Sequence, residues 1–448
     1  MRRRRLLLAF VLVACGSSEC RVDPSPSCSY RPERGVAPDA AVETFADEIR
    51  YARAGDVHVC ALLSTGDDVF GGEANRPRCW GGNPVGQLAQ RGSPAIGELW
   101  WYSRWEEVGP FAVGPAHACL VDDDDPGEDG EEDGPEVGCW GNDAGGQLGV
   151  APEGEREGIV AAFRPPDEVT GLALGALHSC VATAATVSCW GDDRWAQLGT
   201  PESSCCEPVP VDDGAWTDVE RAAIELSAGT RHTCALLRGT DEDADAPGSA
   251  FCWGHAGFGQ LGHDAGAGPG RVPLDEVTGI AAGPHHTCAL AAGSLWCWGR
   301  NGAGELGLGD TTDRATPTAV ALDGTTDGAV AVFAGGESGV AFAGELDAVA
   351  PGSAHTCVLD AEGHAWCWGS NDAGQLGIPA SEPVTRPVPV HPDQRFESLT
   401  LGGRFTCGVT LDERLLCWGA NELGQLGRTG EGGPEPSEVP VFVESFAG

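Results

Sequence analysis

The chain has 448 residues and a formal net charge of −40, with 67 Asp and Glu side chains against 27 basic residues, all of them arginine. The absence of lysine excludes Schiff-base catalysis and the phosphate-gripping lysine of a P-loop. So negative a chain repels nucleic acid and anionic lipid headgroups, which excludes both as ligands.

Residues 1–14 have the features of an export signal. Arg2 to Arg5 form a basic start, and the apolar stretch over residues 6–14 is too short to span about 30 Å of hydrocarbon. The following Leu12-Val13-Ala14-Cys15-Gly16 resembles the lipobox of bacterial lipoproteins, where lipid is attached to the cysteine; ordinary cleavage with an incidental cysteine is the alternative. We expect a signal peptide over residues 1–14, lipidation at Cys15, a lipid-anchored linker over residues 15–40, and a location at the bacterial cell envelope, on the outer membrane or cell surface.

Residues 41–448 repeat a unit of about 50 residues seven times. The fifth copy reads His286-Thr287-Cys288, then Cys297-Trp298-Gly299, then Gly304-Glu305-Leu306-Gly307. Each unit contains short alternating segments separated by glycine-rich turns, which predicts a four-stranded antiparallel blade. A repeat of this length indicates units that bury their faces against one another, as in a propeller.

Each unit carries two cysteines on successive predicted strands. In the tightest copies eight residues separate them, enough for a hairpin that sets the two cysteines opposite one another. Zinc is disfavoured because a unit offers two thiols, one histidine and no Cys-x-x-Cys. We predict an oxidising compartment and one disulfide per blade: Cys60–Cys79, Cys119–Cys139, Cys180–Cys189, Cys234–Cys252, Cys288–Cys297, Cys357–Cys367 and Cys407–Cys417. Cys20 and Cys28 could close a loop in the linker, and Cys205 and Cys206 stay unassigned.

The other motif residues are interpreted as scaffold. The histidine two residues before the first cysteine is replaced by Phe405 in the seventh unit, and a phenyl ring fills a packing niche but cannot bind a metal. The tryptophan of each Cys-Trp-Gly is predicted to pack between blades, and the glutamine of Gly-Gln-Leu-Gly to hold turn backbone. No catalytic residue, resident metal or cofactor is assigned.

Three units carry insertions between their two cysteines, over residues 64–78, 121–137 and 238–250. Because the insertion point is equivalent, all three should emerge on one face of the disc. Two of them are strongly acidic and form a candidate binding face, through Asp122, Asp123, Asp124, Asp125, Glu131, Glu132, Asp241, Asp243 and Asp245. The spacing of the last three aspartates is that of an opening EF-hand loop, but Ala246 and Cys252 replace its glycine and closing glutamate. Calcium binding, docking of a basic partner and plain solvation remain open.

Two further segments depart from the repeat. Residues 316–350 are read as an insertion between the fifth and sixth units, either a decayed hairpin or a projecting wedge. Trp100, Trp101 and Trp105 form an aromatic cluster that could anchor a protein, stack on a sugar or pack under a long loop.

At these motifs the chain resembles the regulator of chromosome condensation repeat family. The resemblance covers residues 50–448 and implies an all-β fold, a seven-bladed β-propeller of four-stranded antiparallel blades. It also implies ring closure by pairing of the N-terminal segment near Glu48 to Ala52 with the C-terminal strand near residues 437–443. The family includes a nucleotide-exchange factor, ubiquitin-ligase modules and secreted β-lactamase inhibitors, so binding of a protein through a disc face is the expectation that carries over.

The first hypothesis is therefore a monomeric, non-enzymatic, lipid-anchored propeller that binds a protein at the cell envelope. A carbohydrate-binding propeller is the alternative, with a pocket beside Trp100, Trp101 or Trp105. An exported lyase is the third hypothesis, which a His/Glu cluster in the central channel would support.

Overall fold

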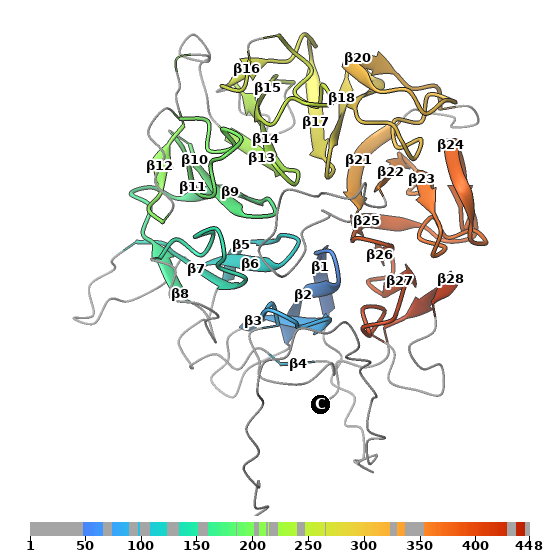
Figure 1. The fold of residues 1–448 in the computed structure, drawn as a ribbon. Coiled ribbons are helices and arrows are strands. Elements are labelled where there is room, and N and C mark those ends of the chain that lie inside the picture. The colour runs from blue at the N-terminus through green and yellow to red at the C-terminus, as the bar shows by residue number, and fades with distance from the viewer. Residues whose placement is uncertain are drawn as a thin grey trace, which may run out of the picture. The chain divides into compact units, whose positions relative to one another are not determined.

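The computed structural model describes residues 48–65, 74–88, 97–98, 108–122, 134–150, 160–184, 186–200, 206–211, 214, 223–239, 247–264, 266–322, 329–336, 354–427 and 436–443. All of them belong to a compact unit over Thr44–Gly448, which is separate from residues 1–43. The described strands form seven four-stranded antiparallel sheets arranged in a ring (Figure 1). This confirms the predicted seven-bladed, all-β propeller.

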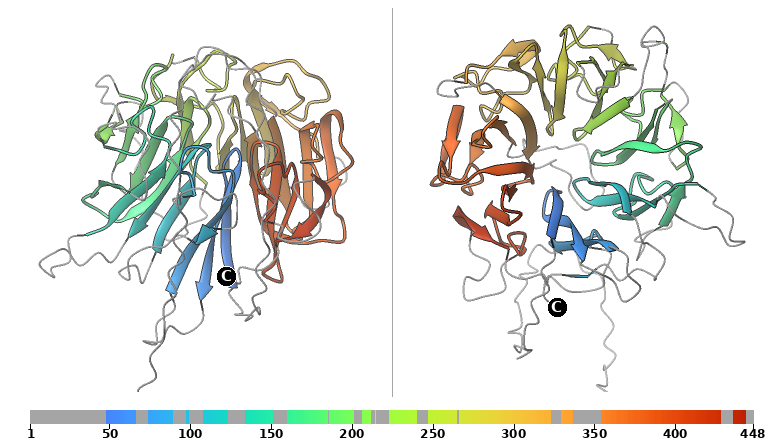
Figure 2. Two further views of the ribbon diagram at one scale, coloured as in Figure 1. Left: turned by 60° about the horizontal axis from the view of Figure 1, so that its bottom comes forward. Right: turned by 180° about the vertical axis from the view of Figure 1, so that it is seen from behind.

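Each blade is built from four strands in chain order, from the centre of the ring outward (Figure 2). Blade 1 contains β1 (Glu48–Ala54), β2 (His58–Thr65), β3 (Ala74–Gly81) and β4 (Gly97–Glu98). Blade 2 contains β5 (Val108–Val113), β6 (His117–Asp122), β7 (Glu136–Gly141) and β8 (Val160–Phe163). Blade 3 contains β9 (Val169–Leu174), β10 (His178–Thr183), β11 (Val187–Gly191) and β12 (Val209–Pro210).

The remaining blades repeat this order. Blade 4 contains β13 (Ala223–Ala228), β14 (His232–Arg238), β15 (Ser249–Gly254) and β16 (Gly270–Arg271). Blade 5 contains β17 (Val277–Ala282), β18 (His286–Ala291), β19 (Ser294–Gly299) and β20 (Arg314–Ala319). Blade 6 contains β21 (Ala329–Gly336), β22 (Ala354–Asp360), β23 (Ala365–Asn371) and β24 (Ser381–Val390), and blade 7 contains β25 (Phe396–Leu401), β26 (Phe405–Thr410), β27 (Leu415–Gly419) and β28 (Ser437–Phe442).

The second strand of each blade lies between its neighbours and is buried along its length. In β18, all six residues from His286 to Ala291 are buried, because both of its sheet faces pack against adjacent blades. The strand that follows ends in Cys-Trp-Gly, whose glycine takes a left-handed conformation, with φ of 106° at Gly299. A side chain would be strained there, which explains why the third residue of the triplet is glycine in every unit.

The seven predicted disulfides are present, one in each blade. The two cysteines face one another across the second and third strands, as Cys288 and Cys297 do in β18 and β19 with 4.1 Å between their Cα atoms. Cys206 is also disulfide-bonded.

The predicted closure of the ring is wrong for the described residues. No strand from the C-terminus pairs with a strand from the N-terminus, because blade 1 uses β1 to β4 and blade 7 uses β25 to β28. Instead, β1 packs side by side with β25 and β26. Backbone and side-chain hydrogen bonds join the two blades, from Ala54 N to Thr400 Oγ1 at 2.8 Å and from Trp80 Nε1 to Gln425 O at 3.0 Å.

The segment 316–350 is not an insertion between blades, as its sequence suggested. Its beginning lies in β20, the outer strand of blade 5, and residues 329–336 form β21, the innermost strand of blade 6. The extra length falls between β21 and β22, where residues 337–353 replace the three-residue connection found in the other six blades. Those residues lie outside the described ranges.

The disc has two different faces. On one, which we call the turn face, lie the connections between first and second strands and the Gly-Gln-Leu-Gly turns that follow the third strands. The opposite face, the hairpin face, carries the connections between second and third strands. The three sequence insertions all belong to connections of the latter kind, as predicted.

Candidate functional site

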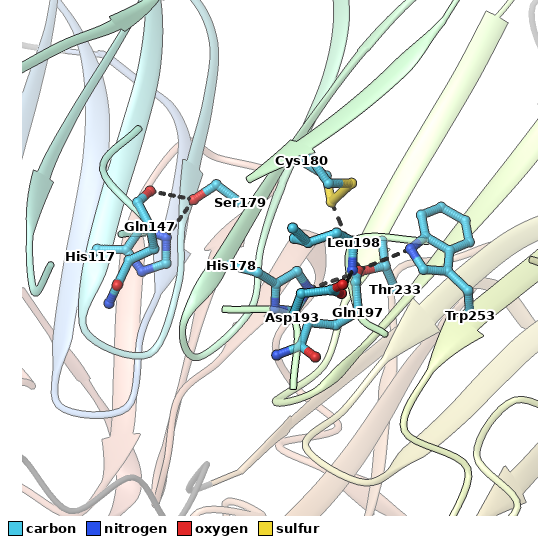
Figure 3. The surroundings of a disulfide bond; sticks show 11 residues. His117, Gln147, His178, Ser179, Cys180, Asp193, Gln197, Leu198, Thr233 and Trp253 are labelled. Carbon is cyan, nitrogen blue, oxygen red and sulfur yellow. Dashed lines mark hydrogen bonds between the residues drawn. A yellow bond between two sulfur atoms is a disulfide. The ribbon is translucent and has the colours of Figure 1, made fainter. Parts of the chain in front are cut away.

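The motif histidines join each blade to the next through a hydroxyl group. His117 Nε2 lies 2.9 Å from Ser179 Oγ in the next blade, and that hydroxyl donates to the Gln147 carbonyl at 2.8 Å (Figure 3). The motif tryptophan of the next blade donates to the same type of carbonyl, as Trp253 Nε1 does to Gln197 O at 3.0 Å. We call this arrangement of histidine, hydroxyl, tryptophan and glutamine carbonyl the clasp.

The histidine–hydroxyl part of the clasp occurs at five of the seven blade interfaces. The pairs are His117–Ser179, His178–Thr233, His232–Thr287, His286–Thr356 and His355–Thr406, at 2.8–3.0 Å. Because each hydroxyl donates to a carbonyl, it accepts from Nε2–H, so each of these rings carries a proton on Nε2. Burial lowers the pKa of His286 and His355 to about 3 and that of His178 to about 4. The prediction that these histidines pack between blades is confirmed for the described interfaces.

The motif glutamines hold their own turns, as predicted. In six blades the side-chain Oε1 accepts from the backbone N–H two residues earlier, for example from Trp195 N to Gln197 at 2.8 Å. In blade 5 Glu305 takes this place, and its Oε2 accepts from Ala303 N at 2.6 Å. Burial raises the pKa of Glu305 to about 7, so this turn contains a carboxyl group that titrates near neutral pH.

Both interfaces of blade 1 lack the histidine–hydroxyl pair of the clasp but keep its tryptophan–carbonyl hydrogen bond, from Trp80 Nε1 to Gln425 O and from Trp140 Nε1 to Gln87 O, each at 3.0 Å. At the junction with blade 7, Phe405 takes the place of the histidine and Val59 takes the place of the hydroxyl residue, so two buried apolar side chains replace the polar pair. At the junction with blade 2, His58 remains but the hydroxyl position is occupied by Ala118. His58 is fully buried, and neither of its ring nitrogens has a hydrogen-bond partner.

Restoring the missing hydroxyl should stabilise the protein. We expect Ala118→Ser to raise the free energy of unfolding by about 1–2 kcal/mol, because a new hydrogen bond forms and a buried nitrogen gains a partner. The opposite change, Ser179→Ala at the next interface, should lower it by a similar amount. Urea unfolding of the wild type and the two variants checks this, and an Ala118→Ser variant no more stable than the wild type would contradict it.

On the turn face, blades 3, 4 and 5 display a row of aromatic rings that the clasp does not use. Trp195, from the turn after β11, makes an edge contact with His255 at 4.8 Å between ring centroids. His255 contacts Phe258 at 5.9 Å, and Phe258 contacts His285 at 5.3 Å. Trp195 is 40% exposed although the protein buries its seven motif tryptophans fully.

Two arginines lie over this row. The guanidinium of Arg231 is 5.1 Å from the centre of the Trp195 ring, and that of Arg300 is 5.9 Å from the centre of the Phe258 ring. Both distances are within the range of cation–π contacts. We call the set of Trp195, Arg231, His255, Phe258, His285 and Arg300 the aromatic patch.

The positive charge of the aromatic patch comes from its arginines. Burial, followed by the charge of Arg300, lowers the pKa of His285 to about 3. Burial and the charge of Arg231 lower the pKa of His255, whose Nδ1 accepts from the Gln260 amide at 2.8 Å. Both imidazoles are therefore neutral at physiological pH, and they support the rings beside the two cations.

The structure contradicts one of the residues predicted on the acidic face. Asp122 is only 2% exposed at the end of β6, between Val108 and Glu136 on the neighbouring strands, so it cannot contact a partner. The other candidates lie outside the described residues: Asp123, Asp124, Asp125, Glu131, Glu132, Asp241, Asp243, Asp245, Trp100, Trp101, Trp105 and the lipidation residue Cys15.

Within the described part of the chain, one trio of side chains could hold a metal ion, formed by Asp360, Glu362 and His364 in the β22–β23 hairpin. The Asp360 carboxylate already accepts from His364 N at 2.9 Å, from His364 Nδ1 at 3.0 Å and from Glu362 N at 3.1 Å. These bonds lower the pKa of Asp360 although burial opposes them. The trio closes a tight turn, and we assign it no metal. None of the described residues belongs to a helix long and apolar enough to span a bilayer.

The signal for the aromatic patch is present in the repeat but weak in any one unit. Two residues before the motif glutamine, blades 2 and 6 have Gly145 and Ala373, whereas blades 3 and 4 have Trp195 and Phe258. A seven-fold alignment of the turns would have shown this departure. Sequence reasoning treated all these turns as scaffold and looked for function on the opposite face.

Comparison with known proteins agrees with this architecture. The regulator of chromosome condensation (RCC1) repeat matches residues 292–342, 362–409 and 412–448, and a second profile of the repeat matches residues 277–305, 347–375 and 396–425. The ultraviolet-B receptor UVR8 of Arabidopsis thaliana is 27% identical over 191 residues, 40% of this chain and 36% of the receptor. The chain thus matches little more than a third of that relative's length.

Solved structures show the same fold at low sequence identity. Prp20p from Saccharomyces cerevisiae, studied for its binding to Gsp1p and histones, is similar with a TM-score of 0.63 and 21% identity over 83% of this chain and 86% of that one. Yeast RCC1 (Prp20) bound to Kap60 is similar with a TM-score of 0.66 and 19% sequence identity, over 94% of this chain and 92% of that one. Human WBSCR16 is similar with a TM-score of 0.52 and 20% sequence identity, over 68% of this chain and 78% of that one. The chain therefore carries regulator of chromosome condensation repeats and folds as a propeller of the kind seen in Prp20p.

Proposed function

We propose that this protein is a non-enzymatic, lipid-anchored propeller of the bacterial cell envelope that binds another protein through its turn face. The observation that carries the proposal is the aromatic patch, in which an exposed Trp195 lies beneath the guanidinium of Arg231. Tryptophan and arginine are the residues most often responsible for binding energy at protein interfaces.

The fold does not need these rings. Gly145 and Ala373 occupy the position of Trp195 in blades whose clasp is intact, so a small residue suffices there. The motif tryptophans are fully buried and already donate to carbonyls of neighbouring blades. The exposed Trp195 and the half-buried Phe258, on the surface of two adjacent blades, are thus best explained by contact with a partner.

The chemistry of the patch indicates what kind of segment would bind. Arg231 and Arg300 place two positive charges over apolar rings in a protein whose net charge is −40. A partner segment that combines carboxylates with apolar side chains would complement both features. Prp20p has been studied for binding to Gsp1p and histones and in complex with Kap60, which supports a protein as the class of partner.

The alternatives have less support. The lyase hypothesis called for histidine and glutamate in the channel, and the described residues that line it include Glu225 but no histidine. The carbohydrate-binding hypothesis rested on Trp100, Trp101 and Trp105, which lie outside the described residues. Export and lipidation at Cys15 rest on the signal sequence, and the disulfide in every blade is consistent with an oxidising compartment.

Site-specific photo-crosslinking on living cells tests the proposal. A benzophenone amino acid at Arg194, beside Trp195, should capture a defined protein, and the same probe at Leu411 on the hairpin face should not; Leu411 is 61% exposed and serves as the matched control. Capture should be lost when Trp195→Ala is combined with the probe. Equal products at both positions, or products that survive Trp195→Ala, would contradict binding at the turn face.

A further inference from the structure

Two cavities lie in the centre of the ring and share part of their walls. One, of about 430 Å³, is lined by the innermost strands of all seven blades. The other, of about 400 Å³, is lined by blades 1 to 4. Arg53 and Glu225 line both, so the two cavities adjoin. Volumes of this size are typical of small-molecule sites.

Arg53 supplies a positive charge to this channel. Its guanidinium lies 4.9 Å from the centre of the Tyr51 ring and donates through Nη1 to Ala52 O at 3.0 Å. No carboxylate among the described residues forms an ion pair with it. Arg53 is exposed to the channel, and the surrounding strands lower its pKa. The remaining donors of the guanidinium are available to an anion in the channel.

A second arginine in the same cavity is held by a carboxylate. Arg238 Nη2 lies 3.2 Å from Glu225 Oε2 and 2.9 Å from Thr278 O. Burial raises the pKa of Glu225 although Arg238 opposes the shift. Among the described residues that line the smaller cavity, Arg53, Arg238 and Glu225 are charged and give it one net positive charge, and the larger cavity is lined by Asp56 in addition to Arg53 and Glu225.

We propose that the channel binds a small organic anion, a carboxylate joined to an apolar body, with Arg53 as the residue that binds the carboxylate. A planar guanidinium matches a carboxylate through two parallel hydrogen bonds. Leu172 and Leu226, which are only partly buried, line both cavities and would contact the apolar body. Burial raises the pKa of Tyr51, so its phenol keeps its proton and can donate to the anion.

Isothermal titration calorimetry of the full mature protein with 2-naphthoate tests this inference. The neutral 2-naphthamide has nearly the same shape and serves as the ligand control. Arg271→Gln is the protein control, because Arg271 is an exposed arginine of an outer strand, 3.1 Å from Asp275. The wild type and Arg271→Gln should bind the carboxylate equally and the amide at least tenfold more weakly.

Three channel variants complete the test. Arg53→Gln should weaken naphthoate binding at least tenfold. Arg53→Lys keeps the positive charge but loses the two parallel N–H donors of the guanidinium, and it should weaken binding less. Glu225→Gln should strengthen binding several-fold because it removes the one negative charge of the smaller cavity. Absence of binding by the wild type, equal affinity for the amide, or unchanged affinity in Arg53→Gln would overturn the proposal. Retained thermal unfolding midpoints exclude misfolding as the cause.

Discussion

Acidification from pH 7 to 4.5 is expected to lower the free energy of unfolding by about 10 kcal/mol, which is comparable to the whole stability of an ordinary domain. The cause is the neutral, buried histidines of the clasp and His58. Burial lowers the pKa of five of them, His58, His117, His178, His286 and His355, to about 3 to 4, against an ordinary value of 6.5, and it also lowers the pKa of His232. As the pH falls, the unfolded chain therefore binds protons at these histidines that the folded chain does not bind. Their contribution to the free energy of unfolding is fully present above pH 6.5 and is lost progressively below it.

The size of this effect follows from the individual groups. Each of the five histidines with a pKa of about 3 to 4 contributes a loss of about 2.5 kcal/mol between pH 7 and 4.5, which sums to about 12 kcal/mol before the opposing effect of Glu305. Glu305 acts in the opposite direction, because its pKa of about 7 in the folded state makes the folded protein take up a proton in the same interval. Carboxylates with lowered pKa values, such as Asp360, titrate below this window.

Urea unfolding at successive pH values between 6.5 and 4.5 measures the number of protons taken up. The matched variant is His355→Phe with Thr406→Val, which copies the natural pair Phe405 and Val59 at the interface of blades 7 and 1. Its pH slope should be smaller by about one proton. A wild-type stability independent of pH, or an identical slope in the variant, would show that these histidines are not buried neutral groups.

Reduction of the disulfides is expected to prevent folding at neutral pH. Each bond closes a loop of 9 to 20 residues between adjacent strands, which stabilises the fold by about 3 kcal/mol in the chain-entropy model. Seven such bonds contribute about 20 kcal/mol, more than the net stability of typical domains. Refolding from denaturant with and without reductant, followed by far-ultraviolet circular dichroism, tests the expectation.

Single-blade variants separate the contribution of one bond from the total. Cys288→Ala with Cys297→Ala should lower the free energy of unfolding by about 3 kcal/mol. The corresponding pair in blade 7, Cys407 and Cys417, should add its own loss independently, because blades 5 and 7 are not neighbours. A reduced protein that refolds with native stability would refute the assigned role of the disulfides.

Much of the fold could be predicted because the same pattern of cysteine, tryptophan and glycine residues occurs in all seven units. Eight residues between two cysteines suffice for a hairpin that sets them opposite one another, and the structure places Cys288 opposite Cys297. Phe405 in the place of a histidine indicated packing, and it now faces Val59 rather than a hydroxyl. The spacing of the cysteines was the informative signal in the first case, and a substitution within the repeat was the signal in the second.

Ring closure and the sixth blade could not be read in the same way. A repeat defines the order of the strands but not which strand begins a blade. The sequence therefore did not determine which strands pair in the first and last blades, and the sheet order shows this. β21 was missed because residues 337–353 separate it from the His355 motif, where other blades have three residues. Asp122 was misjudged because it belongs to the buried end of β6 and not to the acidic loop after it.

The aromatic patch depends on the three-dimensional order of the blades. Its side chains come from five separate turns, and none forms a motif by itself. Sequence distance between Trp195 and Arg300 gives no indication that they lie on one face. The propeller brings them together because equivalent turns of successive blades are neighbours on the disc.

The affinity of the crosslinked partner for purified variants tests the central claim most directly. Arg231→Gln with Arg300→Gln removes the charge of the aromatic patch, and replacement of residues 123–133 by Gly and Ser removes the acidic loop of the hairpin face. Binding through the turn face predicts that the first variant binds at least tenfold more weakly and that the second binds like the wild type. Loss of binding only when the acidic loop is replaced would contradict it and assign the interaction to the hairpin face.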